Sequence, residues 1–423
     1  MQYTYIGVDS HKDTHTAVFL DCFFEKLGEI VFDNTAAAFP DFLSAAETFK
    51  QDGTIFLFGL EDVSSYGRAL ARFLLNNRQP VKHVNSYLVS QERKNISIAI
   101  EKNDSIDAEC AARLLISKFG TLSNATDDEQ YWLLRSLVVQ RDFIIQSNVR
   151  LKTYLHNLLT QDFPGYHNFF DGFEGKAALA FFTKYPSAGT LKGVSEEELG
   201  QFLCENSHGA LKIERARKIL KATDTTSTVH EIRNATINST LQQYVFNMKE
   251  LEKAEDALAK TYAEFGTTLT SMKGLDVPSA AQILSCIGDI NKFSTPAKLA
   301  RYAGIAPTTY ASGKKDMQYS NQRGNRELNS YIYRLATRLI VAYETNRGKE
   351  DAYIKAFNPF FYNYFHRKVS EGKTKKQALK CVMRRLVNII WTMLTNCEEY
   401  VNPPMVEIEK LKTSEQVIKS SEQ

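Results

Sequence analysis

Four carboxylates in the N-terminal part of the chain have positions that suit a shared site. Asp9 comes at the end of the apolar segment YTYIGVDS, and Glu61 ends a second apolar segment, TIFLFGLE. Both segments have the composition of strands, and two neighbouring strands would present their end residues at one edge of a sheet. Asp104 and Asp107 are spaced i, i+3 in KNDSIDAE, which places both on one face of a predicted helix. The four side chains can therefore converge.

The chemistry expected of such a cluster depends on metal ions. Carboxylates gathered in one place repel each other unless cations neutralise them, and hard oxygen ligands select Mg²⁺ or Mn²⁺. Two such ions, roughly 3.5–4 Å apart, can activate a nucleophile and stabilise the leaving oxygen in a phosphodiester displacement. Any one of the four acids could instead be structural, in a turn or cap or on a helix surface. Their joint placement favours the metal site, with Asp13, Asp21 and Asp62 as weaker candidates nearby.

The spacing of histidines and cysteines does not predict a zinc site. His11 and His15 have an HxxxH spacing, but no further His or Cys lies near enough in the sequence to complete a ligand set. We therefore expect both histidines to belong to the loop that follows the first strand. The six cysteines are scattered without a CxxC pair, which indicates buried thiols and no disulfide framework.

Positive charge is concentrated in one region of the chain. The net charge is only +3, yet between Lys298 and Arg385 there are 19 Lys and Arg residues against six acids. Basic side chains interleaved with aromatics and amides, as in YASGKKDMQYSNQRGNR and FYNYFHRKVSEGKTKK, suit contacts with nucleic-acid phosphates, and a solvated basic face is the alternative. The candidates for nucleic-acid binding are Lys314, Lys315, Arg323, Arg326, Lys373, Lys375 and Lys376.

The elements that must position the acids belong to a predicted α/β domain over residues 1–125. YTYIGVDS, TAVFLD and EIVFDN have strand patterns, and TAAAFPDFLSAAETFK has the pattern of a helix. The strand TIFLFGLE, the amphipathic segment SSYGRALARFLLNN and the strand VKHVNS follow. Three strands in a meander, followed by strand, helix and strand, is the order expected of a ribonuclease-H-like sheet.

Residues 126–265 are predicted to form two long helices with a helical insertion at about 161–235. Leu137, Ile144, Leu151 and Leu158 recur every seven residues, and from Leu241 to Phe265 apolar residues recur at alternating steps of three and four. The pair could form an antiparallel coiled coil or a dimer interface, or could pack within one bundle. The sequence does not decide between these readings.

An all-α C-terminal domain is predicted over residues 266–402, and a flexible tail over 403–423. The chain has no apolar run of the roughly 18 residues that a membrane span requires, and its start lacks the plan of a signal peptide. We therefore expect a cytoplasmic protein without a membrane partner.

Taken together, the segments resemble a known family. IGVDSHKDTHTAVFLD, LEDVSSYGRALARFL and KNDSIDAECAARLL, followed by the long segment from MKGLDVPSAAQIL to NQRGNRELNSYIYRLA, are similar to the insertion-sequence one-ten family of transposases. Relatives of that family include the Piv-type DNA invertases. The resemblance covers nearly the whole chain, from Tyr5 to about Tyr400.

The resemblance implies a fold and a nucleophile. Its RuvC-like domain carries a DEDD quartet, which falls here on Asp9, Glu61, Asp104 and Asp107 as Mg²⁺ or Mn²⁺ ligands. A coiled coil joins this domain to a C-terminal transposase domain, whose catalytic serine matches Ser312 in YASGKK. A serine–DNA phosphodiester would conserve bond energy for rejoining. Without the resemblance, Ser312 would be interpreted as part of a Ser-Gly turn, with Ser320 and Ser330 as rival nucleophiles.

The resemblance also implies partners. The expected activity is that of a DNA transposase and recombinase acting on donor and target DNA, with a structured non-coding bridge RNA as guide. The expected assembly is a homo-oligomer, a dimer or tetramer, in which the serine and the acids come from different subunits. A Piv-like site-specific invertase, a RuvC-like junction nuclease that uses water, and a non-catalytic nucleic-acid-binding scaffold are the alternatives.

Overall fold

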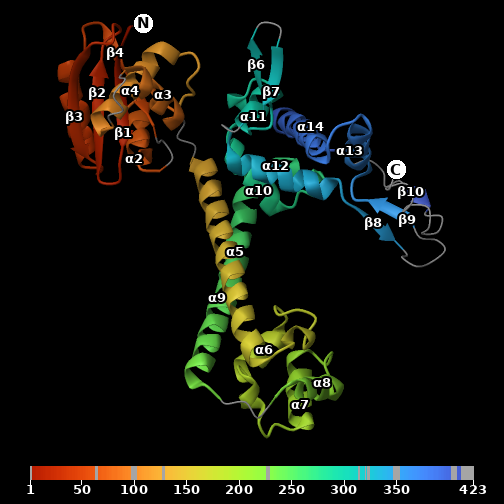
Figure 1. Cartoon of the computed structure of the whole chain (residues 1–423). Helices are drawn as coiled ribbons and strands as arrows, with labels where there is room; N and C mark the ends of the chain where they lie inside the picture. Colours follow the sequence, from red (N-terminus) through yellow and green to blue (C-terminus); the bar gives the residue numbers. More distant parts are fainter. Residues whose placement is uncertain are drawn as a thin grey trace. The chain divides into compact units, whose positions relative to one another are not determined.

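The structure, a computed structural model, divides into two compact units, Met1–Trp132 and Leu133–Gln423, which we describe separately (Figure 1). None of the helices within the described ranges combines the length and the apolar character needed to cross a membrane. The residues described are 2–61, 65–96, 102–125, 129–224, 229–312, 315–319, 321, 324–345, 353–401 and 407–410.

The first unit is built on a five-stranded sheet with the order β3-β2-β1-β4-β5. β1 pairs antiparallel with β2, and β2 with β3, whereas β1–β4 and β4–β5 are parallel pairs. This is the mixed sheet expected of a ribonuclease-H-like domain. Its strands are β1 (Gln2–Ser10), β2 (Thr14–Leu20), β3 (Lys26–Asp33), β4 (Thr54–Leu60) and β5 (Val81–His83).

Helices cover both faces of this sheet. On one face, Phe39 and Phe42 of α1 and Leu70 of α2 share a core with alternate residues of the strands, such as Ile6 and Phe58. On the other face, α3 and α4 bury a second apolar cluster against β1 and β4. The helices are α1 (Ala38–Ala46), α2 (Arg68–Asn76), α3 (Ser86–Ile96) and α4 (Asp104–Lys118).

Two glycines let α4 lie unusually close to the centre of the sheet. Gly7 of β1 and Gly59 of β4 are register partners. A Cβ added at Gly7 would meet the carbonyl oxygen of Ala108 at 2.0 Å, and one added at Gly59 would meet Leu115 Cγ at 2.9 Å. The first distance ends on backbone, so no rotamer change could relieve it. The absence of side chains at these two positions therefore fixes the depth of α4.

The second unit contains the two long helices predicted from the sequence, α5 (Glu129–Asp162) and α9 (Glu231–Ala263). They run antiparallel, since Arg141 pairs with Glu255 while Ser147, further along α5, accepts a hydrogen bond from Asn247. Near their middle the buried residues include Ile144 but also the polar Asn148, and Met248, which continues the apolar repeat of α9, is exposed. A heptad-packed coiled coil is therefore not confirmed.

The predicted insertion forms a core of its own together with the adjoining ends of α5 and α9. Phe163, Phe181 and Phe182 are fully buried at its centre and contact one another edge to face or at a tilt. Leu155 of α5 and Tyr244 of α9 belong to the same core. Its helices are α6 (Lys176–Lys184), α7 (Glu196–Asn206) and α8 (Ile213–Ala222).

The C-terminal part is not the all-α domain that was predicted, because a hairpin and a three-stranded sheet interrupt its helices. β-branched and aromatic residues in TTYAS and YIKA favour strands there. Residues 407–410, within the predicted flexible tail, pair with β9. The elements are α10 (Val277–Ile287), α11 (Pro296–Tyr302), β6 (Thr308–Ser312), β7 (Lys315–Tyr319), α12 (Arg326–Leu339), β8 (Ala342–Thr345), β9 (Tyr353–Ala356), α13 (Pro359–Ser370), α14 (Lys375–Asn396) and β10 (Glu407–Lys410).

Replacing Gly7 with alanine is expected to destabilise the first unit by at least about 1–3 kcal/mol, the usual cost of overpacking a core, because the new methyl group collides with the α4 backbone. Denaturant unfolding of the full chain measures this free energy. Gly120→Ala is the control, since a Cβ there meets nothing within 4 Å. Equal stability of the two variants would contradict the close packing of α4 on β1.

Candidate metal centre

The pleat of the sheet places two of the predicted carboxylates on the α4 side. Side chains two residues apart on a strand share a face, so Asp9 lies on the face of Gly7. Glu61 directly follows β4, and its backbone N–H donates to the carbonyl oxygen of Val8 in β1. The strand positions of Gly59 and Glu61 repeat those of Gly7 and Asp9. Asp9 and Glu61 therefore lie on the sheet face that packs against α4.

The N-terminus of α4 supplies the other two carboxylates. Asn103 caps the helix by accepting a hydrogen bond from the backbone N–H of Ile106 at 2.8 Å. Asp104 and Asp107 are both in the first turn, where a helix favours negative charge. Asp107 is buried, whereas the side chain of Asp104 is more than half exposed. We call Asp9, Glu61, Asp104 and Asp107 the acidic centre.

His11 lies within the acidic centre, which the sequence analysis did not predict. The chain turns back after β1, and the backbone N–H of His11 donates to the carbonyl oxygen of Thr14. This turn brings His11 Nε2 to 3.1 Å from Asp9 Oδ2 and 3.2 Å from Asp104 Oδ1. The loop position expected for both histidines is correct for His11, whose loop folds over the acids. It is wrong for His15, which is buried within β2. The only sequence signal was the separation of two residues between Asp9 and His11.

Arg93 of α3 is a second residue that the sequence analysis missed. Its Nε lies 2.7 Å from Asp107 Oδ1. The pair is close but poorly aligned, because neither atom has a hydrogen-bond partner among the described residues although both are buried. Nothing in the sequence around Arg93 indicates this contact, since it depends on how α3 packs against α4. Asp107 therefore keeps a buried carboxylate oxygen that accepts no hydrogen bond in the part of the chain described.

The electrostatics of the centre follow from crowded negative charge. Burial raises the pKa of Asp9, and the charges of Asp107 and Asp104 raise it further, although His11 opposes the shift. Burial also raises the pKa of Glu61, with added repulsion from Asp9 and Asp107. Burial lowers the pKa of His11, but the carboxylates of Asp9 and Asp104 outweigh this effect and raise it. The site thus disfavours its own full ionisation and attracts a cation.

These residues fit a divalent cation. Donor atoms of Asp9, His11 and Asp104 all lie within 4.8 Å of one another. Asp107, which has one cationic neighbour in Arg93, and Glu61, whose charge interacts with those of Asp9 and Asp107, add two further hard oxygen donors close to this group. Oxygen donors with one imidazole nitrogen suit Mg²⁺ or Mn²⁺, and the latter accepts nitrogen more readily. The four acids and His11 are therefore the residues that would hold a metal ion.

The predicted residues of the C-terminal region lie in the second unit. Ser312 is the last residue of β6 and is paired in register with Lys315, the first residue of β7. Lys314 and Arg323 fall outside the described residues, as does the rival serine Ser320. Ser330 is on α12.

The remaining basic candidates lie at two helix starts. Arg326 is the first residue of α12, after the cap formed by Asn325, and it is exposed. Lys373, Lys375 and Lys376 surround the capping box at the start of α14 and are all exposed. Positive charge at a helix start opposes the helix dipole, so the position of these lysines costs stability.

Models of known protein families match the region of the acidic centre and the region of Ser312. The family model for the DEDD transposases of IS110 elements matches residues 6–164, which include the whole acidic centre. A second model, described as a transposase of the IS116/IS110/IS902 family, matches residues 266–352, which include Ser312. The chain belongs to the IS110/IS116 family of transposases. As a transposase it acts on DNA, which it cuts and rejoins.

Individual relatives extend the comparison. This transposase is 25% identical over 418 residues to a 44.8 kDa protein of insertion element IS116 from Streptomyces clavuligerus, covering 95% of this chain and 97% of the relative. It is 32% identical over 147 residues to a 43.6 kDa protein of IS110 from Streptomyces coelicolor, covering 34% and 32% of the two chains. A pilin gene-inverting protein from Moraxella bovis is 30% identical over 128 residues, covering 30% of this chain and 35% of that protein.

Divalent cations are expected to stabilise this transposase through the acidic centre. Millimolar Mn²⁺ should raise the midpoint of thermal unfolding by a few degrees, because an ion that binds only the folded state adds to its stability. Asp9→Asn should remove most of that shift. The control is Asp52→Asn, an exposed acid of the loop before β4, which should keep it. An unchanged shift in Asp9→Asn would contradict the assignment.

Proposed function

We propose that this transposase is a metal-dependent DNA recombinase that acts through a covalent serine–DNA intermediate. The observation that supports it most is that donor atoms of Asp9, His11 and Asp104 all lie within 4.8 Å of one another, and that Glu61 and Asp107 are close enough for their charges to act on Asp9 or on each other. Ser312 lies within the region that the family's second model matches, and we propose its hydroxyl as the nucleophile.

The proposed step is a displacement at phosphorus. Ser312 Oγ attacks the scissile phosphate, an oxygen–phosphorus bond to the serine forms, and the bond to the leaving deoxyribose oxygen breaks. The serine proton is taken up by a base, and the leaving oxygen ends as a hydroxyl. That hydroxyl, or one from another strand, can attack the phosphoserine and reverse the step, so rejoining needs no external energy. Bound divalent ions would lower the pKa of the serine hydroxyl and stabilise the leaving oxygen.

We assign different tasks to the acidic residues of the first unit and the basic residues of the second. The carboxylates of the acidic centre hold positive charge close to the phosphate that reacts. Arg326, Lys373 and Lys376 are exposed and suit the neighbouring phosphates, which fix the position of the strand but carry no sequence information. We assign Lys314, Lys315 and Arg323 the same task, because they flank Ser312 in the sequence.

A nuclease that uses water is the second candidate. The acidic centre lies entirely within the first unit, and Ser312 lies in the second. The acids could therefore activate a water molecule without the serine. The matched region of the pilin gene-inverting protein leaves inversion as an alternative outcome of the same serine chemistry.

We also propose an oligomeric assembly and an RNA that guides the protein to its DNA. We propose a homo-oligomer, because Phe143 of α5 and Phe246 of α9 leave large apolar side chains exposed on the long helices. A subunit's serine would then work with the acids of a neighbour. We propose that an element-encoded RNA selects the target sequence by base pairing, because a strongly basic region without a recognisable sequence-reading motif is compatible with that division of tasks.

The covalent step is tested by trapping. Wild-type protein incubated with end-labelled DNA of its own element and Mn²⁺ should give a protein–DNA adduct that survives denaturing gel electrophoresis. Ser312→Ala should give none. The matched control is Ser330→Ala, a serine on α12 that the sequence left as a rival. Adduct formation by Ser312→Ala would refute the serine mechanism, and cleavage without any adduct would favour the water-using nuclease.

The metal centre is tested by Asp104→Asn. Cleavage should fall by more than about a hundredfold, because losing even the outer support of a metal ligand costs about 10–100-fold. DNA affinity should stay within about twofold, since the basic surface of the second unit is untouched. Asp41→Asn, in the first turn of α1, is the control for an exposed acid at a helix start. Full cleavage by purified Asp104→Asn would contradict the proposal.

A further inference from the structure

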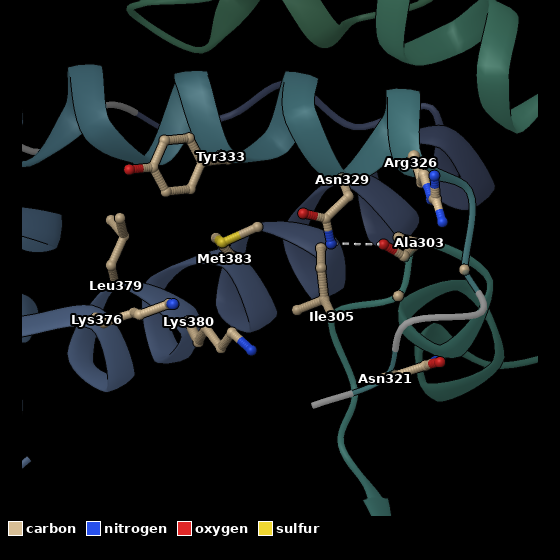
Figure 2. A pocket seen from close by; sticks show the side chains of 12 residues that line it. Ala303, Ile305, Asn321, Arg326, Asn329, Tyr333, Lys376, Leu379, Lys380 and Met383 are labelled. Atoms are coloured by element: carbon tan, nitrogen blue, oxygen red, sulfur yellow. Dashed lines mark hydrogen bonds between the residues drawn. The ribbon is translucent and has the colours of Figure 1, made fainter. Parts of the chain in front are cut away.

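A pocket of about 430 Å³ lies between α12 and α14 in the second unit (Figure 2). Tyr333 and Asn329 enter it from α12, and Lys376 and Lys380 enter it from α14. Its apolar floor is formed by two buried α14 residues, Leu379 and Met383. The pocket thus combines an aromatic ring, amide groups and cations over an apolar base, which is the composition of a nucleotide site.

The wall of this pocket is a tight backbone crossing. Gly324 passes so close to Gly304 that a Cβ on Gly324 would lie 2.1 Å from the Gly304 nitrogen. Asn329 Nδ2 donates to the carbonyl oxygen of Ala303 at 2.9 Å, and Asn321 Nδ2 donates to that of Arg301 at 3.2 Å. These bonds hold the segment after α11 in one conformation. The pocket is therefore formed in advance of any ligand.

A second pocket of about 670 Å³ adjoins the first. The two share Ile305 and Lys380 in their linings. Arg301, Lys373 and Arg384 also line the second pocket. The Arg384 Nη1 atom is buried and has no hydrogen-bond partner among the described residues. Four cationic side chains line this pocket in all, so it favours an anion.

The cations follow α14 in a regular row. Lys376, Lys380 and Arg384 are spaced four residues apart and so lie on one face, each about 6 Å further along the axis. No acidic residue belongs to the described lining of either pocket. A row of positive charges with this spacing suits successive phosphates of one extended strand.

Tyr333 is placed to receive a base. About half of its surface is exposed, and no other ring or cation lies over it in the described part of the chain. By contrast, the ring of Tyr364, which lines the second pocket, is already covered by Arg367 at 5.2 Å and Arg385 at 5.4 Å. A base can stack on an open aromatic face only after leaving the stack of its own duplex.

We propose that the two pockets form one groove for a single strand of DNA, with one unstacked base against Tyr333 and the following phosphates on Lys380 and Arg384. This deepens the proposed function and rests on it. Pro307 lines the second pocket, and the next residue, Thr308, begins the strand that carries Ser312. That continuity favours the DNA strand under reaction, rather than RNA, as the occupant.

Equilibrium binding without divalent ions tests the groove separately from cleavage. The full chain is titrated into a fluorescent single-stranded DNA, its duplex, and RNA of the same sequence. Tyr333→Ala should weaken binding of the single strand by about tenfold, the scale of one lost base stack, and leave the duplex unchanged. Tyr333→Phe should keep the affinity of the wild type. Tyr343→Ala, an exposed tyrosine on β8, is the matched control and should bind normally.

Two further readouts report the geometry. The emission of 2-aminopurine in the single strand should be quenched on binding to wild type and to Tyr333→Phe, but not to Tyr333→Ala. Lys380→Ala should lower the salt dependence of single-strand binding by about 0.7 in slope, the value for one phosphate contact, whereas Lys292→Ala should not. Equal losses on duplex and single strand, no loss in Tyr333→Ala, or tighter binding of RNA than of DNA would each overturn the proposal. Because no cleavage is measured, these outcomes are independent of whether Ser312 forms an adduct.

Discussion

The packing of α4 against β1 and β4 is the constraint on which the acidic centre depends. Carboxylates at strand ends and at a helix start meet only if the helix lies almost on the backbone of the sheet. The paired glycines Gly7 and Gly59 permit that approach, since a side chain at Gly7 would meet the α4 backbone. The pleat then places Asp9 and Glu61 on the same face. The stability of this core thus carries the cost of bringing like charges together.

Polar side chains help to hold the helices of the second unit together. Asp142 on α5 accepts hydrogen bonds from Gln282 of α10 at 2.8 Å and from Tyr331 of α12 at 3.0 Å. Burial and the Asp142 charge both raise the pKa of Tyr331, so this hydroxyl stays protonated and remains a donor. The long helix α5 is thereby attached to the helix that carries Tyr333 and Arg326.

The sequence predicted the parts of the site that depend on local pattern. The strand that ends at Asp9, the helix face shared by Asp104 and Asp107, and the two long helices all have periodicities that hold without tertiary context. His11 and Arg93 were missed because a turn and a helix–helix contact bring them to the acids. The C-terminal strands were not predicted because β6 and β7 are too short for an alternation of apolar and polar residues to indicate a strand. They are recognised only from their pairing with each other. Met248 belongs to the apolar repeat of α9 but is exposed, so a repeat of apolar residues does not by itself predict burial.

Locating a bound divalent ion tests the proposed metal centre most directly. Crystals of the full transposase grown with Mn²⁺ should give an anomalous scattering peak within ligand distance of Asp9 and Asp104, with Glu61 or Asp107 completing an oxygen-rich shell at about 2.0–2.2 Å, close to the Mg²⁺ range. A cation bound there would confirm that the packing of α4 on the sheet positions these acids as metal ligands. A peak elsewhere, or none at this position while Arg93 and His11 continue to neutralise the acids, would contradict it.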